Sequence, residues 1–174
     1  MVLNVPTGIP AAGKLSVTII PRASVTNLAA ITVAQATAPT AVNASCHLQG
    51  DGYGRTTTES TGTGRRACDD YEYDIPGPKK TEFDALRFVY DPQNPDAEVS
   101  KVYAALTEGE EYVIVERIGI SGKTELAAQD YYNAYPMRVS VKEQMVPGAD
   151  GELEFTVNVR STGAPVKDAQ IASA

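Results

Sequence analysis

The chain has 174 residues, of which 43% are hydrophobic and 21% are charged, as is typical of one folded domain with one core. Its net charge of -7 argues against a simple nucleic-acid-binding protein, because such a protein presents a basic face. No apolar run approaches the roughly 18 residues that cross a bilayer, and the N-terminus lacks the basic and then apolar pattern of a secretory signal.

Residues 1–14 are punctuated by proline and glycine, which predicts an extended N-terminal arm. Short apolar runs then predict strands at 15–20, 31–38 and 44–48, and a proline follows each of the first two. With 14 Gly, 11 Pro and many Thr and Val, the composition favours a mainly β fold.

Residues 49–66 are rich in Gly, Thr and Ser and have no apolar periodicity, which predicts a long loop. A loop of this length inside a compact domain is usually functional or disordered. Residues 67–74 follow as a predicted acidic strand, and the sequence Ile75-Pro76-Gly77-Pro78 predicts a turn.

The clearest local signals lie in residues 83–106. Leu86, Phe88 and Tyr90 alternate with their neighbours as in a half-buried strand, and the proline at position 92 ends that strand. Pro95 suits the first position of a helix, and the apolar residues at 99, 102, 103 and 106 form one stripe. The pattern predicts one α-helix at about 95–107, against which the strands pack.

Residues 111–120 are nearly continuous in apolar side chains and predict a central strand. Residues 124–134 fit either a short helix or a loop. Strict alternation on both sides of a Pro- and Gly-containing turn predicts an antiparallel hairpin over 137–160. The β domain is therefore expected to span 15–161, and the small, polar residues 162–174 predict a flexible or interface-ordered tail.

Two patterns could carry chemistry, and each has a simpler structural interpretation. Gly122-Lys123-Thr124 follows a strand, but a phosphate-binding loop needs a glycine where Arg117 stands, so a strand-ending turn is favoured. Cys46, His47 and Cys68 match no zinc-ligand spacing, and reduced, buried cysteines are expected instead. His47 is the only histidine, which leaves little basis for acid–base catalysis. We expect no catalytic residue, metal or cofactor.

The middle of the chain, residues 48–93, resembles the major tail protein, or tail tube protein, of long-tailed phages (siphoviruses) that infect actinobacteria. The resemblance depends on Arg65-Arg66-x-Cys68-x-x-Tyr71-Glu72, on the Pro-Gly turn after it, and on LRFVYDPQ at 86–93. It implies a β-sandwich or partly closed β-barrel with one flanking helix, and a protein that is not an enzyme. It also implies that six copies join their sheets into a ring, and that rings stack into a hollow tube for genome delivery.

The net charge has a sign that suits such a tube. Six copies at -7 would carry roughly -42 per ring (6 × 7), a field that repels phosphate and lets DNA slide through without binding. We expect the lumen-facing acids to be Asp69, Asp70, Glu72, Glu152 and Glu154. We expect contacts between subunits or rings to be made by Arg55, Arg65 and Arg66.

The resemblance further implies partners and a location. The partners would be further copies of the chain, a tape measure protein, and tail tip and terminator proteins. The protein would reside in the virion tail, after assembly in the host cytoplasm. An alternative is a β-sandwich module for virion decoration, adhesion or receptor binding, and a third possibility, a small nucleotide-dependent enzyme, depends on Gly122-Lys123-Thr124 alone.

Overall fold

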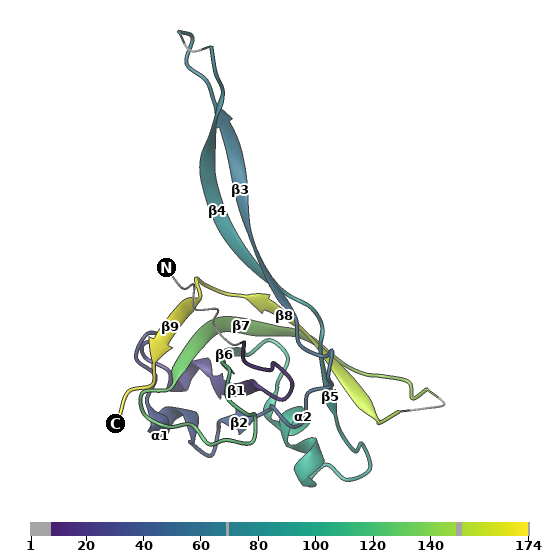
Figure 1. Ribbon diagram of the computed structural model, residues 1–174. Coiled ribbons are helices and arrows are strands. Elements are labelled where there is room, and N and C mark those ends of the chain that lie inside the picture. The colour runs from purple at the N-terminus through teal and green to yellow at the C-terminus, as the bar shows by residue number, and fades with distance from the viewer. Residues whose placement is uncertain (1–7, 69, 149–150, 174) are drawn as a thin grey trace.

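A computed structural model describes residues 8–68, 70–148 and 151–173. Its main body is a curled antiparallel sheet in the order β2-β1-β6-β7-β8-β5, and β9 pairs with the first half of β7 (Figure 1). The strands are β1 (Leu15–Pro21), β2 (Val42–Asn43), β5 (Leu86–Val89), β6 (Glu111–Ile118), β7 (Tyr131–Gln144), β8 (Glu154–Ser161) and β9 (Val166–Gln170).

The segment 42–52 brings the two edges of this sheet toward each other. At one end, Val42 and Asn43 pair with β1. At the other end, the amide of Val89 donates to the His47 carbonyl at 2.9 Å, and the amide of Arg87 donates to the Gly52 carbonyl at 3.0 Å. The sheet is thus a partly closed barrel, and the prediction of a mainly β fold is confirmed.

Two apolar clusters lie on opposite faces of the sheet. Strand β6 shows this most simply, because Ile114 belongs to one cluster and its neighbours Val113 and Val115 belong to the other. The first cluster fills the inside of the barrel, with Phe88 and Phe155 stacked at 5.4 Å between ring centroids. Since both faces of β6 are covered, its nearly continuous apolar sequence is explained, as predicted for 111–120.

The predicted helix is present but shorter than 95–107. It consists of a 3₁₀ turn, η2 (Glu98–Ser100), followed by α2 (Lys101–Ala105), and no described helix is long or apolar enough to span a membrane. The Ser100 hydroxyl bonds both the amide and the carbonyl of Asp91, so the preceding segment turns back before it can become helical. At the other end, the Lys142 ammonium donates to the carbonyls of Tyr103 and Leu106, which a further turn of helix would otherwise use.

The strand predicted at 31–38 is wrong. Residues 33–36 form a short helix, α1 (Val33–Ala36), and a 3₁₀ turn, η1 (Arg22–Ser24), precedes it. Thr32 and Gln35 make a reciprocal capping box, in which each side chain accepts from the other residue's amide. This Thr-x-x-Gln signal is visible in the sequence, and it outweighs the β-branched residues beside it. The strand predicted at 44–48 is also replaced, by a turn that ends in a single bridge between Leu48 and Phe88.

The loop predicted at 49–66 is wrong in its main part. Strand β3 (Arg55–Gly64) pairs with β4 (Tyr73–Phe83), and the resulting hairpin projects far from the barrel (Figure 1); we call it the arm. The predicted acidic strand 67–74 lies mostly in the turn at the end of the arm, and the predicted turn 75–78 lies inside β4. A bulge between Glu59 and Thr61 accommodates the two prolines of β4, which cannot donate to a ladder.

The hairpin predicted over 137–160 is confirmed, since β7 and β8 pair from Met137 to Gln144. The predicted tail at 162–174 is instead partly ordered, because β9 pairs with β7 and Ile171 is buried. Residues 124–130 form a loop. Residues 1–7 of the predicted N-terminal arm lie outside the described residues. Both cysteines are exposed, so the expectation that they are buried is wrong.

Candidate assembly surface

The arm has two different faces. Positions 79, 81 and 83 of β4 share one face near the barrel, since alternate residues of a strand point the same way. Thr81 is buried there, and the hydroxyls of Thr57 and Thr81 share a hydrogen bond of 3.1 Å across the two strands. The bulge in the pairing adds one residue to β4, so Tyr73 and Ile75, which lie farther out and are both about half exposed, are on the opposite face. The arm therefore presents an apolar strip to its surroundings.

Glycines in β3 lie opposite this strip. Gly64 pairs with Tyr73 and Gly62 pairs with Ile75. A Cβ atom at Gly64 would come within 2.7 Å of the Tyr73 ring and 2.8 Å of Ile75 Cδ1, so these two side chains lie over the bare backbone. At Gly62, by contrast, a Cβ atom would meet nothing within 4 Å.

The base of the arm is joined to the barrel by a buried ion pair. Arg55 Nε and Nη2 donate to the two carboxylate oxygens of Glu116 at 3.1 and 2.6 Å. Glu116 is only 2% exposed, and Asn133 Nδ2 also donates to it at 3.0 Å. The Arg55 guanidinium lies 4.7 Å from the centre of the Tyr135 ring, and Phe83 meets the same ring edge-on. These contacts fix the direction in which the arm leaves the barrel.

Two tyrosines beside this ion pair have perturbed acidities. Burial, followed by the negative charge of Glu116, raises the pKa of Tyr135 to about 12. The same causes, burial first, raise the pKa of Tyr53. Both phenols are therefore neutral at physiological pH, and the opposite charges of Arg55 and Glu116 face each other in a largely dry site.

The predicted contact residues occupy two places. Arg65 and Arg66 are exposed at the end of the arm, together with Asp70 and Glu72 of the predicted acidic group. Arg55 lies at the arm's base, where Glu116 of the same chain binds it. Asp69 lies outside the described residues.

The remaining two predicted acids lie on a different projection, where β7 turns into β8. Glu152 accepts a hydrogen bond from Gln49 Nε2 at 3.2 Å. Glu154 is largely covered, and its carboxylate lies 3.9 Å from Arg87 Nη1. The predicted lumen acids therefore form two groups, one on each projection (Figure 1). The structure does not bring them together into one cluster within the chain.

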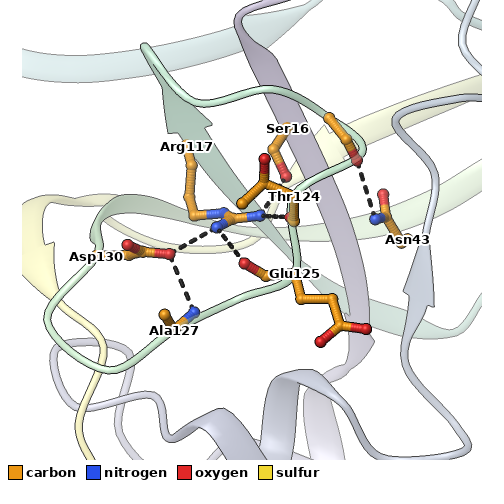
Figure 2. A network of polar contacts seen from close by, with 8 residues as sticks. Ser16, Asn43, Arg117, Thr124, Glu125, Ala127 and Asp130 are labelled. Carbon is orange, nitrogen blue, oxygen red and sulfur yellow. Dashed lines mark hydrogen bonds and ion pairs between the residues drawn. The ribbon is translucent and has the colours of Figure 1, made fainter.

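A buried arginine organises the loop that follows β6. Arg117 is 1% exposed, and Figure 2 shows its guanidinium among the groups that it contacts. It donates to the Thr124 carbonyl at 2.7 Å, the Glu125 carbonyl at 3.1 Å and Asp130 Oδ2 at 2.6 Å. It also donates to Ser16 Oγ at 2.9 Å, which joins this loop to β1. One side chain thus joins several parts of this loop to each other and to β1.

This loop contains the sequence Gly122-Lys123-Thr124. The close packing around Gly122 explains why a glycine stands there, and no bound phosphate is needed to explain it. A Cβ atom at Gly122 would come within 2.6 Å of Ser45 Cβ and 2.9 Å of the Leu15 carbonyl oxygen. Asn43 Nδ2 donates to the Gly122 carbonyl at 3.2 Å. The interpretation of this sequence as a strand-ending turn is confirmed.

The possible metal ligands do not converge. Cys46 and His47 lie in the segment that closes the barrel, whereas Cys68 lies at the end of the arm. His47 Nε2 is engaged with the Glu98 carbonyl at 2.9 Å. Within residues 8–68, 70–148 and 151–173, no group of three or more His, Cys, Asp and Glu side chains is placed to hold a metal ion.

Sequence reasoning missed the arm, although the alternation of Tyr73 and Ile75 opposite two glycines is a signal for it.

Comparison with known proteins identifies the family of the chain. No protein in the curated set matches the chain. A family model described as "Phage tail tube protein" matches residues 2–174, which is nearly the whole chain. The chain therefore belongs to the phage tail tube protein family.

Proposed function

We propose that this protein builds the tail tube as stacked hexameric rings, through which the genome passes into the host cell. Membership of the family makes it a structural component of a phage tail that assembles into a tube with other tail proteins. The finer features are the proposal. They are the six-fold ring, the long-tailed morphology, an actinobacterial host, assembly in that host's cytoplasm, and contact with tape measure, tail tip and terminator proteins.

The observation that carries the proposal is the arm. A two-stranded ribbon is marginally stable in water unless a further strand or surface covers it. Outside its base, the arm has exposed side chains on both strands and between them, including Tyr71 at 85% and Tyr73 and Ile75 at 47% each. A neighbouring subunit that covers this ribbon would provide the missing contacts. The arm is thus the part of the chain best suited to join one ring to the next.

Charge supports the proposed conduit. With a net charge of -7 per chain, a ring of any size is strongly acidic, which opposes adsorption of DNA. We propose that the acids Asp69, Asp70, Glu72, Glu152 and Glu154 contribute to the lumen, and that Arg65 and Arg66 contact a neighbouring copy. Arg55 has a partner in its own chain, so we assign it the anchoring of the arm.

Electron microscopy of the purified protein at high concentration tests the proposal. Hollow tubes with six-fold end views are expected, and size-exclusion chromatography at low concentration should show smaller species. Monomers or trimers at every concentration would contradict the proposal and favour a decoration, adhesion or receptor-binding module.

Charge reversal at Arg65 and Arg66 tests their role separately. The double change to glutamate should alter the thermal unfolding of the monomer little, because contacts of exposed charges contribute little to stability, and should abolish tubes. The matched control is Lys123→Glu, which reverses an exposed cation in the loop after β6. Normal tubes from the double variant would show that these arginines make no essential contact.

A further inference from the structure

The exposed apolar side chains of the described residues gather mainly on two projections. One is the arm, with Tyr71, Tyr73 and Ile75. The other is the projecting end of the β7–β8 hairpin, with Val141, Met145, Val146 and Leu153; we call its described residues, 141–148 and 151–153, the β7–β8 tip. Figure 1 shows that the arm and the β7–β8 tip leave the barrel in different directions. Neither projection can cover the other within one chain.

The apolar strip of the arm contains an open notch at Gly62. Glycine in the interior of a strand is unfavourable, and it often marks a place where another backbone approaches closely. Gly62 lies opposite Ile75, its backbone is outside the left-handed region, and the space above its Cα is empty to 4 Å. No close contact with the described residues therefore requires glycine at this position.

The β7–β8 tip carries a protruding side chain, which we call the knob, next to hydrogen-bonded backbone. Val146 is 92% exposed, the highest value among the large hydrophobic side chains of the described residues. Just behind it, the Met145 amide donates to the Glu154 carbonyl at 3.0 Å, and the Tyr90 amide donates to the Leu153 carbonyl at 3.0 Å. The position of Val146 is thus largely set before any partner arrives, which reduces the entropy lost on binding.

We propose that the β7–β8 tip of one copy docks on the arm of a second copy, with Val146 in the notch beside Ile75. The inference rests on the proposed tube, and it names the two surfaces that meet. A second copy is the occupant because members of this family assemble with themselves. Each chain carries both a knob and a notch at separate places, as a heterologous contact that propagates from copy to copy requires.

The first test is cross-linking between two different chains. Cys46→Ser and Cys68→Ser remove the native thiols, and Val146→Cys and Ile75→Cys are then placed in separate chains with tags of different size. After co-assembly and mild oxidation, the mixed dimer should dominate over both homodimers. Ile118→Cys is the matched control for Ile75→Cys, because Ile118 is also an exposed isoleucine but lies at the end of β6.

A glycine substitution provides an independent test. Gly62→Val should leave the unfolding temperature of the monomer unchanged or raised, since valine favours strands and its Cβ atom would meet no described atom within 4 Å. It should also abolish the cross-link between positions 146 and 75 by filling the notch. Gly50→Val is the control, because Gly50 is exposed and equally free of contacts, yet lies outside the arm.

The outcomes separate this inference from the proposed function. Tubes that form normally without the mixed cross-link, or with it retained in Gly62→Val, would overturn the docking and leave the tube intact. A dominant Val146→Cys homodimer would show a symmetric contact and would also overturn it. Absence of tubes from the unmodified protein would overturn the proposed function, and this contact with it.

Discussion

Replacing Arg55 by methionine should destabilise the protein strongly, because it removes the cation but leaves the carboxylate of Glu116 buried. Glu116 is 2% exposed and would keep the hydrogen bond from Asn133 Nδ2 but no positive charge beside it from Arg55. Breaking a buried ion pair from one side typically costs 3–5 kcal/mol. The Arg55 side chain is 23% exposed, so water can partly replace it, and about 3 kcal/mol is expected.

For a chain of this size, each kcal/mol lowers the unfolding temperature by about 2–4 °C, so a fall of roughly 6–12 °C is expected. The measurement is thermal unfolding of the monomer by circular dichroism at neutral pH. Adding Glu116→Gln to the Arg55→Met variant should recover part of the loss, about 2 kcal/mol, because the unpaired charge is then gone.

Arg138→Met is the matched control. Arg138 also pairs with a glutamate, Glu111, at 2.7 Å, but both of these side chains are substantially exposed. Its loss should therefore cost less than about 1 kcal/mol. If Arg55→Met were no more destabilising than Arg138→Met, or if the double variant were worse than Arg55→Met alone, the assignment of Arg55 and Glu116 as a buried anchor would be refuted.

Three further predictions concern other contacts. Arg117→Met should lower the free energy of unfolding by about 3–5 kcal/mol, because it leaves Asp130 without its buried partner. Asp130→Asn should lower it less, since the amide oxygen can still accept a hydrogen bond from Arg117. Urea unfolding measures both effects. In an alkaline titration followed by tyrosinate absorbance, Tyr135 should ionise only near its raised pKa of about 12. The stability that its burial provides is complete below about pH 10 and is lost as the pH rises through 12. Titration of Tyr135 near pH 10 in the folded protein would contradict this prediction. Lys142→Met should destabilise α2 by about 1–2 kcal/mol. The Lys142 ammonium donates to two carbonyls there and lies 3.9 Å from the centre of the Tyr103 ring. Hydrogen exchange at the end of α2 measures whether amide protection is lost.

The sequence alone predicted those elements whose signals are local and agree with each other. The alternation around Leu86 and Phe88, the continuous apolar run of β6 and the β7–β8 hairpin all appear in the structure. The family, too, follows from local sequence, because the resemblance in the middle of the chain agrees with the family model over residues 2–174.

Errors arose where the two strands of a pair are mostly exposed. Strand β3 is exposed along nearly its whole length, so it lacks the apolar alternation by which strands are recognised, and its sequence resembles a loop. Strand β4 contains two prolines, which normally argue against a strand, but an arm with no further strands beside it tolerates them. In α1, a capping box of two side chains decided for a helix against β-branched neighbours.

By itself, the sequence determined a mainly β chain, one short helix beside it, an acidic surface and membership of a tail tube family. The tertiary structure alone decided where the charged residues lie. It placed Arg55 against Glu116, 61 positions away, and placed Arg65 and Arg66 at the far end of a projecting ribbon. The physical reason is that local sequence sets backbone preference, whereas the partner of a charged group depends on which distant segments the sheet brings together.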